Sequence, residues 1–368
     1  MFNRWGTFYL SLPLHPMALL PTKKPIIIAG PCGAESNQQL QWLMEGFKDL
    51  PIDMFRAGVW KPRSKPGHFE GRGEEALPWL AELQTQWGKP VCIEVADKEQ
   101  VAMALHYGIQ AVWIGARTTV NPFLVQEIVD ALKGSATLLM IKNPINPDIE
   151  LWSGAVERAL QAGITDMAAI HRGFSVYDPG SLYRNKPLWT LPIELKRRYP
   201  TLPIYCDPSH IAGKRHLVAE VCQRALDLDF DGLMIETHPD PDQALSDAAQ
   251  QITPGTLKVL LAELMVRNNQ RKNLTELEQA RTVLDTMDAE LVALLGRRMD
   301  LARELALLKQ EHNMPVFQLE RWRDIIESRT DWGQQHQLEP DFIHRLFEMI
   351  HDTSIKIQLE SLKNPTEE

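Results

Sequence analysis

Eight short apolar segments follow one another through the first two thirds of the chain, each bounded by turn-forming residues. They are IIIAGPC (26–32), MFRAGVW (54–60), VCIEVA (91–96), AVWIGA (111–116), LLMIKNP (138–144), DMAAIHRG (166–173), PIYCDPSH (203–210) and GLMIETH (232–238). Successive segments begin 20 to 37 residues apart, and stretches compatible with helices lie between them. Apolar runs that alternate with helices are typical of buried parallel strands. Eight such units predict a (β/α)8 TIM barrel of the α/β class.

The alternative fold is an open, doubly wound sheet, but no G-x-G-x-x-G motif follows the first segment to favour it. A second region begins near residue 274, because 19 of the 21 glycines and 22 of the 25 prolines precede that point. Since these residues interrupt helices, their scarcity predicts long helices. We therefore expect an N-terminal extension (1–22), a barrel (23–258), a linker (259–273), a separate all-α three-helix domain (274–362) and a tail (363–368).

Apolar residues recur every seven positions in the second region, with Leu277, Leu284, Leu291 and Leu305 in one column. This pattern predicts a helix of about nine turns. The segments QLERWRDIIESR and PDFIHRLFEMIHDTSIKIQLESL predict two more. A three-helix arrangement with one very long helix cannot easily bury its apolar seam alone, so we expect a homodimer through this domain.

Charge and cysteine content narrow the classes of partner. The chain has 39 basic and 48 acidic residues, a net charge of −9, so the basic field that attracts nucleic acid or anionic membranes is absent. Its 4 cysteines form no C-x-x-C pair, which favours a reducing compartment. No run approaches the roughly 18 apolar residues that a membrane span needs. We expect a cytoplasmic protein that binds neither nucleic acid nor membrane, whether translation begins at Met1 or at Met17.

Five basic residues lie at the ends of the predicted strands, and we expect them to converge on one rim of the barrel. They are Arg56, Lys61, Arg117, Lys142 and Arg172. In a barrel the carboxyl ends of the strands build the active site, and cations gathered there need an anion. The pattern predicts a small ligand that carries phosphate and carboxylate groups. The alternative is that each cation extends its charged end to solvent or pairs with a local acid.

Four further residues have side chains that bind metals: Cys32, His210, Glu236 and Asp247. A thiolate, an imidazole and two carboxylates suit a transition metal such as Mn, Fe, Co or Zn. They lie far apart in the sequence, so only closure of the barrel would bring them together. Glu236 is the strongest candidate, because an acid inside an apolar strand needs a partner.

The segments AGPCGAES, RAGVWKPRS, IGAR, IKNP, HRG, CDPSH and MIETHPDPDQALSD resemble the type Iβ 3-deoxy-D-arabino-heptulosonate 7-phosphate (DAHP) synthases. The resemblance implies that phosphoenolpyruvate condenses with erythrose 4-phosphate. It implies one divalent ion per barrel on Cys32, His210, Glu236 and Asp247, with Mn²⁺ expected first and Fe²⁺, Co²⁺ or Zn²⁺ as alternatives. It also implies that phosphoenolpyruvate binds the five cations named above, of which Lys61 and Lys142 are catalytic.

The same resemblance assigns erythrose 4-phosphate to a short loop that follows the second predicted strand. The implied residues are Lys61, Pro62, Arg63 and Ser64, with Asp207 nearby. Ser64 stands where threonine is commoner, and its hydroxyl is retained. The sister family, the KDO-8-phosphate synthases, usually has KANRS where this chain has KPRS, which disfavours that family. Another aldol-type synthase that uses phosphoenolpyruvate is the alternative function for the barrel.

Polar residues interrupt the apolar columns of the helical region. Arg298 falls in the apolar column that contains Leu291. Lys309 lies 11 residues after Arg298, and 11 steps along an α-helix end within roughly 20° of the starting direction. The two side chains are therefore expected on the same face of the helix. In the last predicted helix Ser354 interrupts an apolar column, and Gln358 follows one turn later. Together these residues predict an anion-binding site. The alternative is a device that sets helix register, or ordinary surface charge.

This region resembles the all-helical chorismate mutases from Leu277 to Leu362. The resemblance implies that chorismate or prephenate binds Arg281, Arg298, Lys309, Gln318, Arg321, Ser354 and Gln358. Of these, Arg298, Lys309 and Gln358 are the catalytic residues, and Arg281 suits the partner chain's site. The family pattern P-V-x-D-x-x-R-E has Gln318 and Trp322 here at its two acidic positions. Because the rearrangement to prephenate needs only conformer selection and charge stabilisation, no nucleophile is expected.

The fusion of the two regions suggests feedback, in which prephenate or chorismate bound to the helical domain inhibits the barrel. The rival interpretation of the helical domain is a non-catalytic sensor and dimerisation module. The two interpretations do not exclude each other. Measurement of chorismate turnover would show whether the helical domain is catalytic.

Overall fold

The computed structural model describes residues 19–21, 24–61, 67, 69–178, 180–266 and 275–363. The chain divides into two compact units, residues 1–268 and 269–368. Most of the expected N-terminal extension (1–22) and residues 267–273 of the expected linker lie outside the described residues. Among the described residues, no helix combines the length and apolarity that crossing a membrane requires.

The first unit is a closed barrel of parallel strands in sequence order. The strands are β1 (Ile26–Gly30), β2 (Met54–Ala57), β3 (Val91–Val95), β4 (Ala111–Ile114), β5 (Leu138–Lys142), β6 (Met167–His171), β7 (Ile204–Cys206) and β8 (Gly232–Glu236). Closure comes from parallel pairing of β1 with β8, in which Ile28 lies opposite Met234. Every strand falls inside one of the eight apolar segments, so the predicted barrel is confirmed and the open sheet is wrong.

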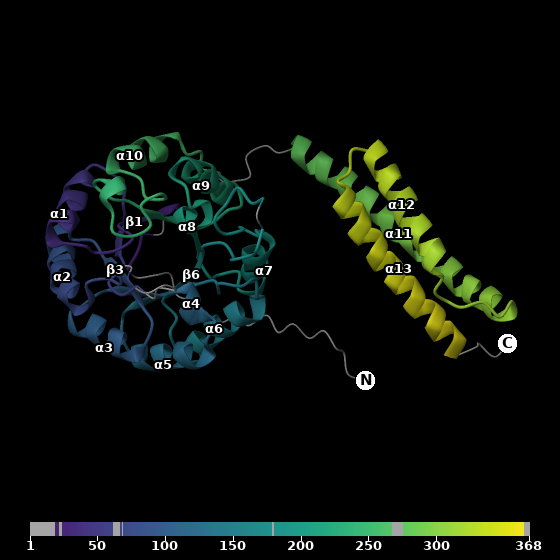
Figure 1. Ribbon diagram of the computed structural model, residues 1–368, viewed down its shortest axis with the longest axis horizontal. Coiled ribbons are helices and arrows are strands. Elements are labelled where there is room, and N and C mark those ends of the chain that lie inside the picture. The colour runs from purple at the N-terminus through teal and green to yellow at the C-terminus, as the bar shows by residue number, and fades with distance from the viewer. Residues whose placement is uncertain are drawn as a thin grey trace. The chain divides into compact units, whose positions relative to one another are not determined.

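Helices form a ring around the strands (Figure 1). They are α1 (Asn37–Gly46), α2 (Ala76–Trp87), α3 (Lys98–His106), α4 (Ala116–Thr119), α5 (Pro122–Leu132), α6 (Ile149–Gln161), α7 (Thr190–Arg198), α8 (Pro208–Ala212), α9 (Val218–Asp227) and α10 (Pro254–Glu263). Side chains cap several of them: Ser36, Asp97 and Asp148 each accept a hydrogen bond from a backbone amide in the first turn. Helix α10 runs through residue 258, where we expected the barrel domain to end.

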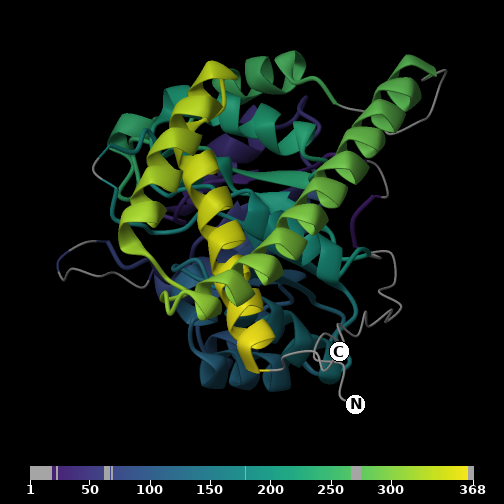
Figure 2. The ribbon, with the colours of Figure 1, turned by 90° about the vertical axis from the view of Figure 1, so that its right-hand side faces the viewer.

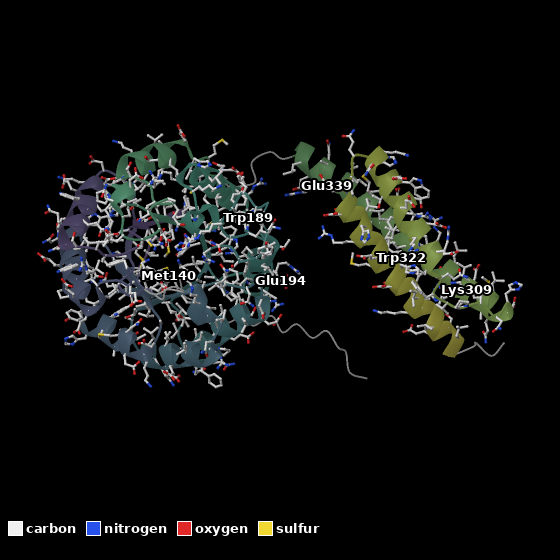
Figure 3. The ribbon with its side chains drawn as sticks, viewed as in Figure 1. Met140, Trp189, Glu194, Lys309, Trp322 and Glu339 are labelled. Carbon is white, nitrogen blue, oxygen red and sulfur yellow. The ribbon has the colours of Figure 1, made fainter. Side chains whose placement is uncertain are left out.

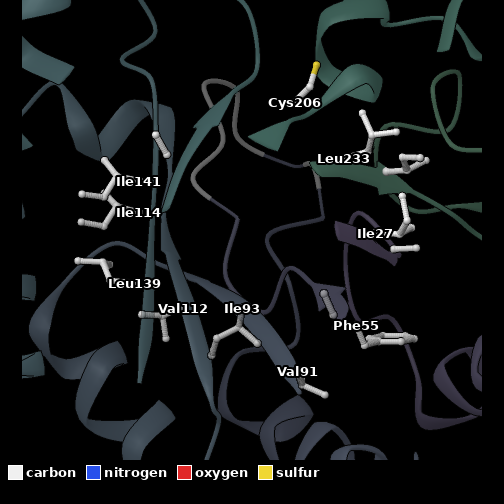
Figure 4. Packing of buried hydrophobic residues seen from close by; sticks show 14 of the residues in the cluster. Ile27, Phe55, Val91, Ile93, Val112, Ile114, Leu139, Ile141, Cys206 and Leu233 are labelled. Carbon is white, nitrogen blue, oxygen red and sulfur yellow. The ribbon is translucent and has the colours of Figure 1, made fainter. Parts of the chain in front are cut away.

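Alternate residues of each strand enter two separate apolar cores, because successive side chains of a strand point to opposite faces. Ile27, Phe55 and Leu139 pack between the strands and the surrounding helices (Figure 4). Their neighbours Ile28 and Met54 fill the barrel interior instead. Both sets are almost fully buried. This double burial explains why the strands are continuously apolar in the sequence.

The described part of the second unit forms three helices, α11 (Thr275–Glu311), α12 (Leu319–Gln335) and α13 (Pro340–Lys363). Helix α13 packs against both α11 and α12. The packing is close at Gly333 of α12, where an added Cβ atom would lie 2.5 Å from Cγ1 of Ile343. The predicted all-α domain with one very long helix is confirmed.

Helix α11 leaves much of its apolar surface uncovered. Leu284 and Leu291 of the heptad column are 59% and 57% exposed, and Leu294 and Leu301 of the same helix are 54% and 57% exposed. The first turns of α11 project beyond α12 and α13 (Figures 1 and 2). An apolar stripe of this kind marks a surface that another helix can cover.

Candidate active sites

A pocket lies at the carboxyl ends of the barrel strands. It is lined by Lys61, Glu94, Ala116, Arg117, Lys142, Arg172, Arg184, His210 and Asp247. Four of the five predicted cations belong to this lining. The fifth, Arg56 of β2, is only 1% exposed and lies within the barrel. The barrel therefore gathers four of the five cations at one pocket at its strand ends, and Arg56 differs from the expectation because it lies deeper in the barrel.

Two acids partly neutralise the buried cations. Arg56 donates from Nη2 to Oε1 of Glu236 at 3.0 Å, and its Nη1 lies 3.8 Å from Oδ2 of Asp207. Lys142 donates from Nζ to Oδ2 of Asp207 at 2.7 Å. Burial disfavours the charged form of Asp207, but the charges of His210 and Lys142 hold its pKa well below the usual value. Pairing with a local acid, the alternative we considered, therefore holds for Arg56 and Lys142.

Amide side chains hold Arg172 at the pocket. Its backbone N–H donates to Oδ1 of Asn143 at 2.7 Å, and its Nη1 donates to Oδ1 of Asn185 at 2.9 Å. Burial lowers the pKa of Arg172 to about 10. The charge of Asp207 opposes this shift, and the charges of Arg184 and Arg117 add to it. Cations that repel one another in this way favour the arrival of an anion.

Three of the four predicted metal ligands meet beside this pocket. Sγ of Cys32 and carboxylate oxygens of Glu236 and Asp247 all lie within 4.8 Å of one another. His210 lies next to them, with Nδ1 3.8 Å from Oε1 of Glu236 and 2.9 Å from Oδ2 of Asp207. Sulfur, carboxylate and imidazole donors together fit a divalent transition metal.

The thiol of Cys32 is at the centre of this group. It donates to Oδ2 of Asp247 at 3.2 Å and accepts from Nζ of Lys61 at 2.8 Å. Burial, and next the charge of Glu236, raises the pKa of Cys32 to about 12. Since a metal binds the thiolate and not the thiol, an incoming cation would displace this proton.

Several residues of the site were missed by the sequence analysis. Glu94 lines the pocket and lies inside the apolar strand β3, as Glu236 lies inside β8. Because an acid inside an apolar strand needs a partner, Glu94 could have been identified from the sequence as Glu236 was. Arg184 donates to Oδ1 of Asp247 at 3.1 Å and to Oε1 of Gln250 at 2.8 Å. Gln250 in turn donates to Oε2 of Glu236 at 2.6 Å. No strand end or motif marks Arg184 or Gln250 in the sequence.

The loop predicted for erythrose 4-phosphate is described only at its first residue. Lys61 lines the pocket, whereas Pro62, Arg63 and Ser64 lie outside the described residues. Asp207, predicted nearby, is fully buried beneath the pocket, where it contacts Lys142 and His210.

The helical unit brings together four of its predicted site residues between α11 and α13. Arg298 donates from Nη1 to Oγ of Ser354 at 2.5 Å. Lys309 donates from Nζ to Oε1 of Gln358 at 3.0 Å and to the backbone carbonyl of Val316 at 2.6 Å. Burial lowers the pKa of both Arg298 and Lys309, and the charge of Arg329 also lowers that of Arg298. Two partly buried cations thus face one side of α13.

The remaining predicted residues of the helical site stay outside this cluster. Arg321 is exposed near the start of α12, and the exposed Arg281 pairs with Glu278 of its own helix at 3.0 Å. Gln318 is half-buried in the N-cap position of α12, where its side chain makes no capping hydrogen bond. Trp322 stacks on His351 of α13, a residue that the sequence analysis did not single out.

Comparison with known proteins gives two family matches. Residues 21–272 match the DAHP synthetase I family, and residues 280–359 match chorismate mutase type II. The phospho-2-dehydro-3-deoxyheptonate aldolase of Thermotoga maritima is 29% identical over 238 residues, which cover 65% of this chain and 68% of that protein. The 2-dehydro-3-deoxyphosphooctonate aldolase of Rhodopseudomonas palustris is 26% identical over 259 residues, with 65% and 86% covered.

The fold agrees with these matches. The crystal structure of the Thermotoga maritima DAHP synthase superposes with a TM-score of 0.59 at 28% identity, over 65% of this chain and 67% of that one. The first match spans most of the chain and includes the whole barrel with its pocket. The chain therefore belongs to the DAHP synthetase I family and carries a chorismate mutase type II domain, with both enzyme activities, fused after its barrel.

Proposed function

We propose that the barrel pocket binds phosphoenolpyruvate through Arg56, Lys61, Arg117, Lys142 and Arg172 and condenses it with erythrose 4-phosphate. The observation that carries this proposal is the cationic pocket directly beside the Cys32, Glu236 and Asp247 cluster. The carboxylate and phosphate of phosphoenolpyruvate satisfy cations that otherwise repel one another. Holding two anionic substrates together converts their encounter into a step within one complex.

In the reaction, C3 of phosphoenolpyruvate attacks the aldehyde carbon, water adds at C2, and inorganic phosphate leaves. Lys61 and Lys142 supply positive charge beside the reacting carbons. Asp207 accepts from Lys142 and contacts His210, so it fixes the position of both. Charges fixed in this way before the substrates bind need no rearrangement during the reaction.

Cys32, His210, Glu236 and Asp247 are the residues that would hold a metal in this site. A divalent ion held there, for which we propose Mn²⁺, would supply Lewis acidity toward the aldehyde carbonyl. Gln250 supports the ligand set because it hydrogen-bonds Glu236, and Arg184 does so because it pairs with Asp247. Such partners orient metal ligands.

The aldehyde substrate separates this proposal from its alternative. We assign erythrose 4-phosphate to Lys61, Pro62, Arg63, Ser64 and Asp207, because the chain has KPRS after β2. Consumption of phosphoenolpyruvate should therefore be fast with erythrose 4-phosphate and at least about tenfold slower with arabinose 5-phosphate. A preference for arabinose 5-phosphate would assign the barrel to the octonate-forming reaction instead.

For the helical domain we propose that Arg298 and Ser354 bind a carboxylate of chorismate, while Lys309 and Gln358 bind the ether oxygen of the breaking bond. Arg281, Gln318 and Arg321 complete the site. The support is the pair of partly buried cations against α13. Because Arg281 is exposed near the projecting end of α11, it is suited to a second copy's site. We propose that the exposed apolar stripe of α11 pairs two copies in a homodimer.

We further propose that prephenate bound to the helical domain inhibits the barrel. In the Arg298→Ala variant, synthase activity without prephenate should be unchanged, but inhibition should weaken at least about tenfold because one carboxylate contact is lost. Arg323→Ala, an exposed cation of the same helical unit, is the matched control and should be inhibited like the wild type. Inhibition that is unaffected by Arg298→Ala, and by ending the chain at residue 265, would contradict control through this domain.

A further inference from the structure

His351 lies on the same face of α13 as the two polar residues of the proposed chorismate site. It precedes Ser354 by three residues and Gln358 by seven, and at 3.6 residues per turn all three share one side of the helix. Ser354 contacts Arg298, and Gln358 contacts Lys309. His351 therefore borders the site one turn before Ser354.

Two aromatic rings fix the orientation of the His351 imidazole. Trp322 of α12 stacks on it, with ring centroids 4.2 Å apart and an interplanar angle of 26°. Phe317 meets it edge-on at 6.1 Å and 66°. Figure 3 labels Trp322 and Lys309 within this helical unit. Contacts with two rings restrict the rotation of the imidazole.

The imidazole nevertheless has an unsatisfied hydrogen-bonding atom. Nε2 of His351 is buried and has no hydrogen-bond partner in the described part of the chain. Leaving a buried polar atom unpaired costs free energy, so such an atom at a binding site points to a ligand group. Burial and then the charge of Arg298 lower the pKa of His351, although Asp352 opposes them, and Lys309 lowers it further, so the neutral form of the ring is favoured.

A neutral imidazole is suited to a hydrogen bond with an uncharged oxygen. Chorismate carries two carboxylates, an ether oxygen and one ring hydroxyl, and the cations account for the charged groups. Trp322 offers only an indole N–H, and so it cannot accept a hydrogen bond from the hydroxyl. We propose that His351 Nε2 forms the hydrogen bond to the ring hydroxyl of the substrate, with Trp322 as the positioning residue that holds the imidazole. This inference rests on the proposed mutase site and adds a substrate contact to it.

The test compares chorismate with an analogue that lacks the ring hydroxyl. His351→Phe keeps an aromatic ring for Trp322 but removes both nitrogens. We expect kcat/KM for chorismate to fall about tenfold, the size of one hydrogen bond to a buried group. The wild type should lose a similar factor on the analogue, whereas His351→Phe should treat the two substrates alike. His351→Gln, which retains a hydrogen-bonding group, should recover part of the preference for chorismate.

Three controls make the outcome decisive. Gln318→Ala should still prefer chorismate to the analogue, and circular dichroism should show that every variant keeps its helix content. If His351→Phe discriminates between the two substrates as strongly as the wild type, or if Gln318→Ala alone removes the discrimination, the proposal is wrong. Arg298→Ala separates this failure from that of the mutase assignment, because unchanged chorismate turnover in that variant would overturn the assignment itself.

Discussion

Replacement of Cys32 by serine is expected to abolish DAHP formation, with a fall in turnover of about a thousandfold. Sγ of Cys32 lies with carboxylate oxygens of Glu236 and Asp247 in one group of donor atoms. A serine hydroxyl does not ionise near pH 7 and binds transition metals far more weakly than a thiolate. A chelator should reproduce the defect in the wild-type protein, and Mn²⁺ should then restore activity. Mn²⁺ should not rescue Cys32→Ser.

Cys222→Ser is the matched control for this experiment. Cys222 is also a buried free cysteine, but it lies on helix α9 and not beside the pocket. The control should retain turnover and its bound metal, whereas Cys32→Ser should lose both. Metal content and phosphoenolpyruvate consumption, measured on the same samples, decide the matter. Full turnover after exhaustive removal of metal would reject the ligand assignment.

Replacement of Arg298 by alanine is expected to lower the kcat for chorismate by about 10²- to 10³-fold, as removal of one donor to a developing charge commonly does. Arg298 is a partly buried cation that donates to Ser354, and alanine leaves that hydroxyl with no charged partner. The exposed Arg323, changed to alanine, should leave turnover within about twofold of the wild type. Loss of chorismate over time is the measurement.

Chorismate turnover by the wild type decides whether the helical domain is an enzyme or a non-catalytic sensor. Gln318 and Trp322 occupy positions where acids are usual, so turnover by the wild type would show that those acids are dispensable in this helical domain. Binding of chorismate or prephenate without any turnover would make the domain a sensor and would contradict the mutase assignment. Arg298→Ala should weaken that binding in either case.

The architecture could be predicted because the signal for it is local. Each barrel strand is buried on both faces and is therefore mostly apolar, and its carboxyl end is visible in the sequence as the point where that run stops. The positions of the cations could be predicted because they lie close to the ends of these apolar runs. The long helix α11 followed from scarce glycine and proline and from the heptad pattern. None of these inferences needs a contact between distant residues.

The detailed site could not be predicted in the same way, because its contacts join residues far apart in the chain. Cys32 and Asp247 are 215 positions apart, and Arg56 and Glu236 are 180 apart. Arg184 lies in a loop where nothing local distinguishes it from a surface arginine. His351 resembles an ordinary helix residue until Trp322, from another helix, is seen to stack on it.

One chain is expected to carry two separate chemistries, and a crossed assay tests this most directly. Purified wild type, Cys32→Ser and Arg298→Ala should each be given phosphoenolpyruvate with erythrose 4-phosphate and, separately, chorismate. We predict that the wild type transforms both, that Cys32→Ser loses only DAHP formation, and that Arg298→Ala loses only chorismate turnover. A wild type without one of the activities, or a single variant that abolishes both while remaining folded, would contradict the account.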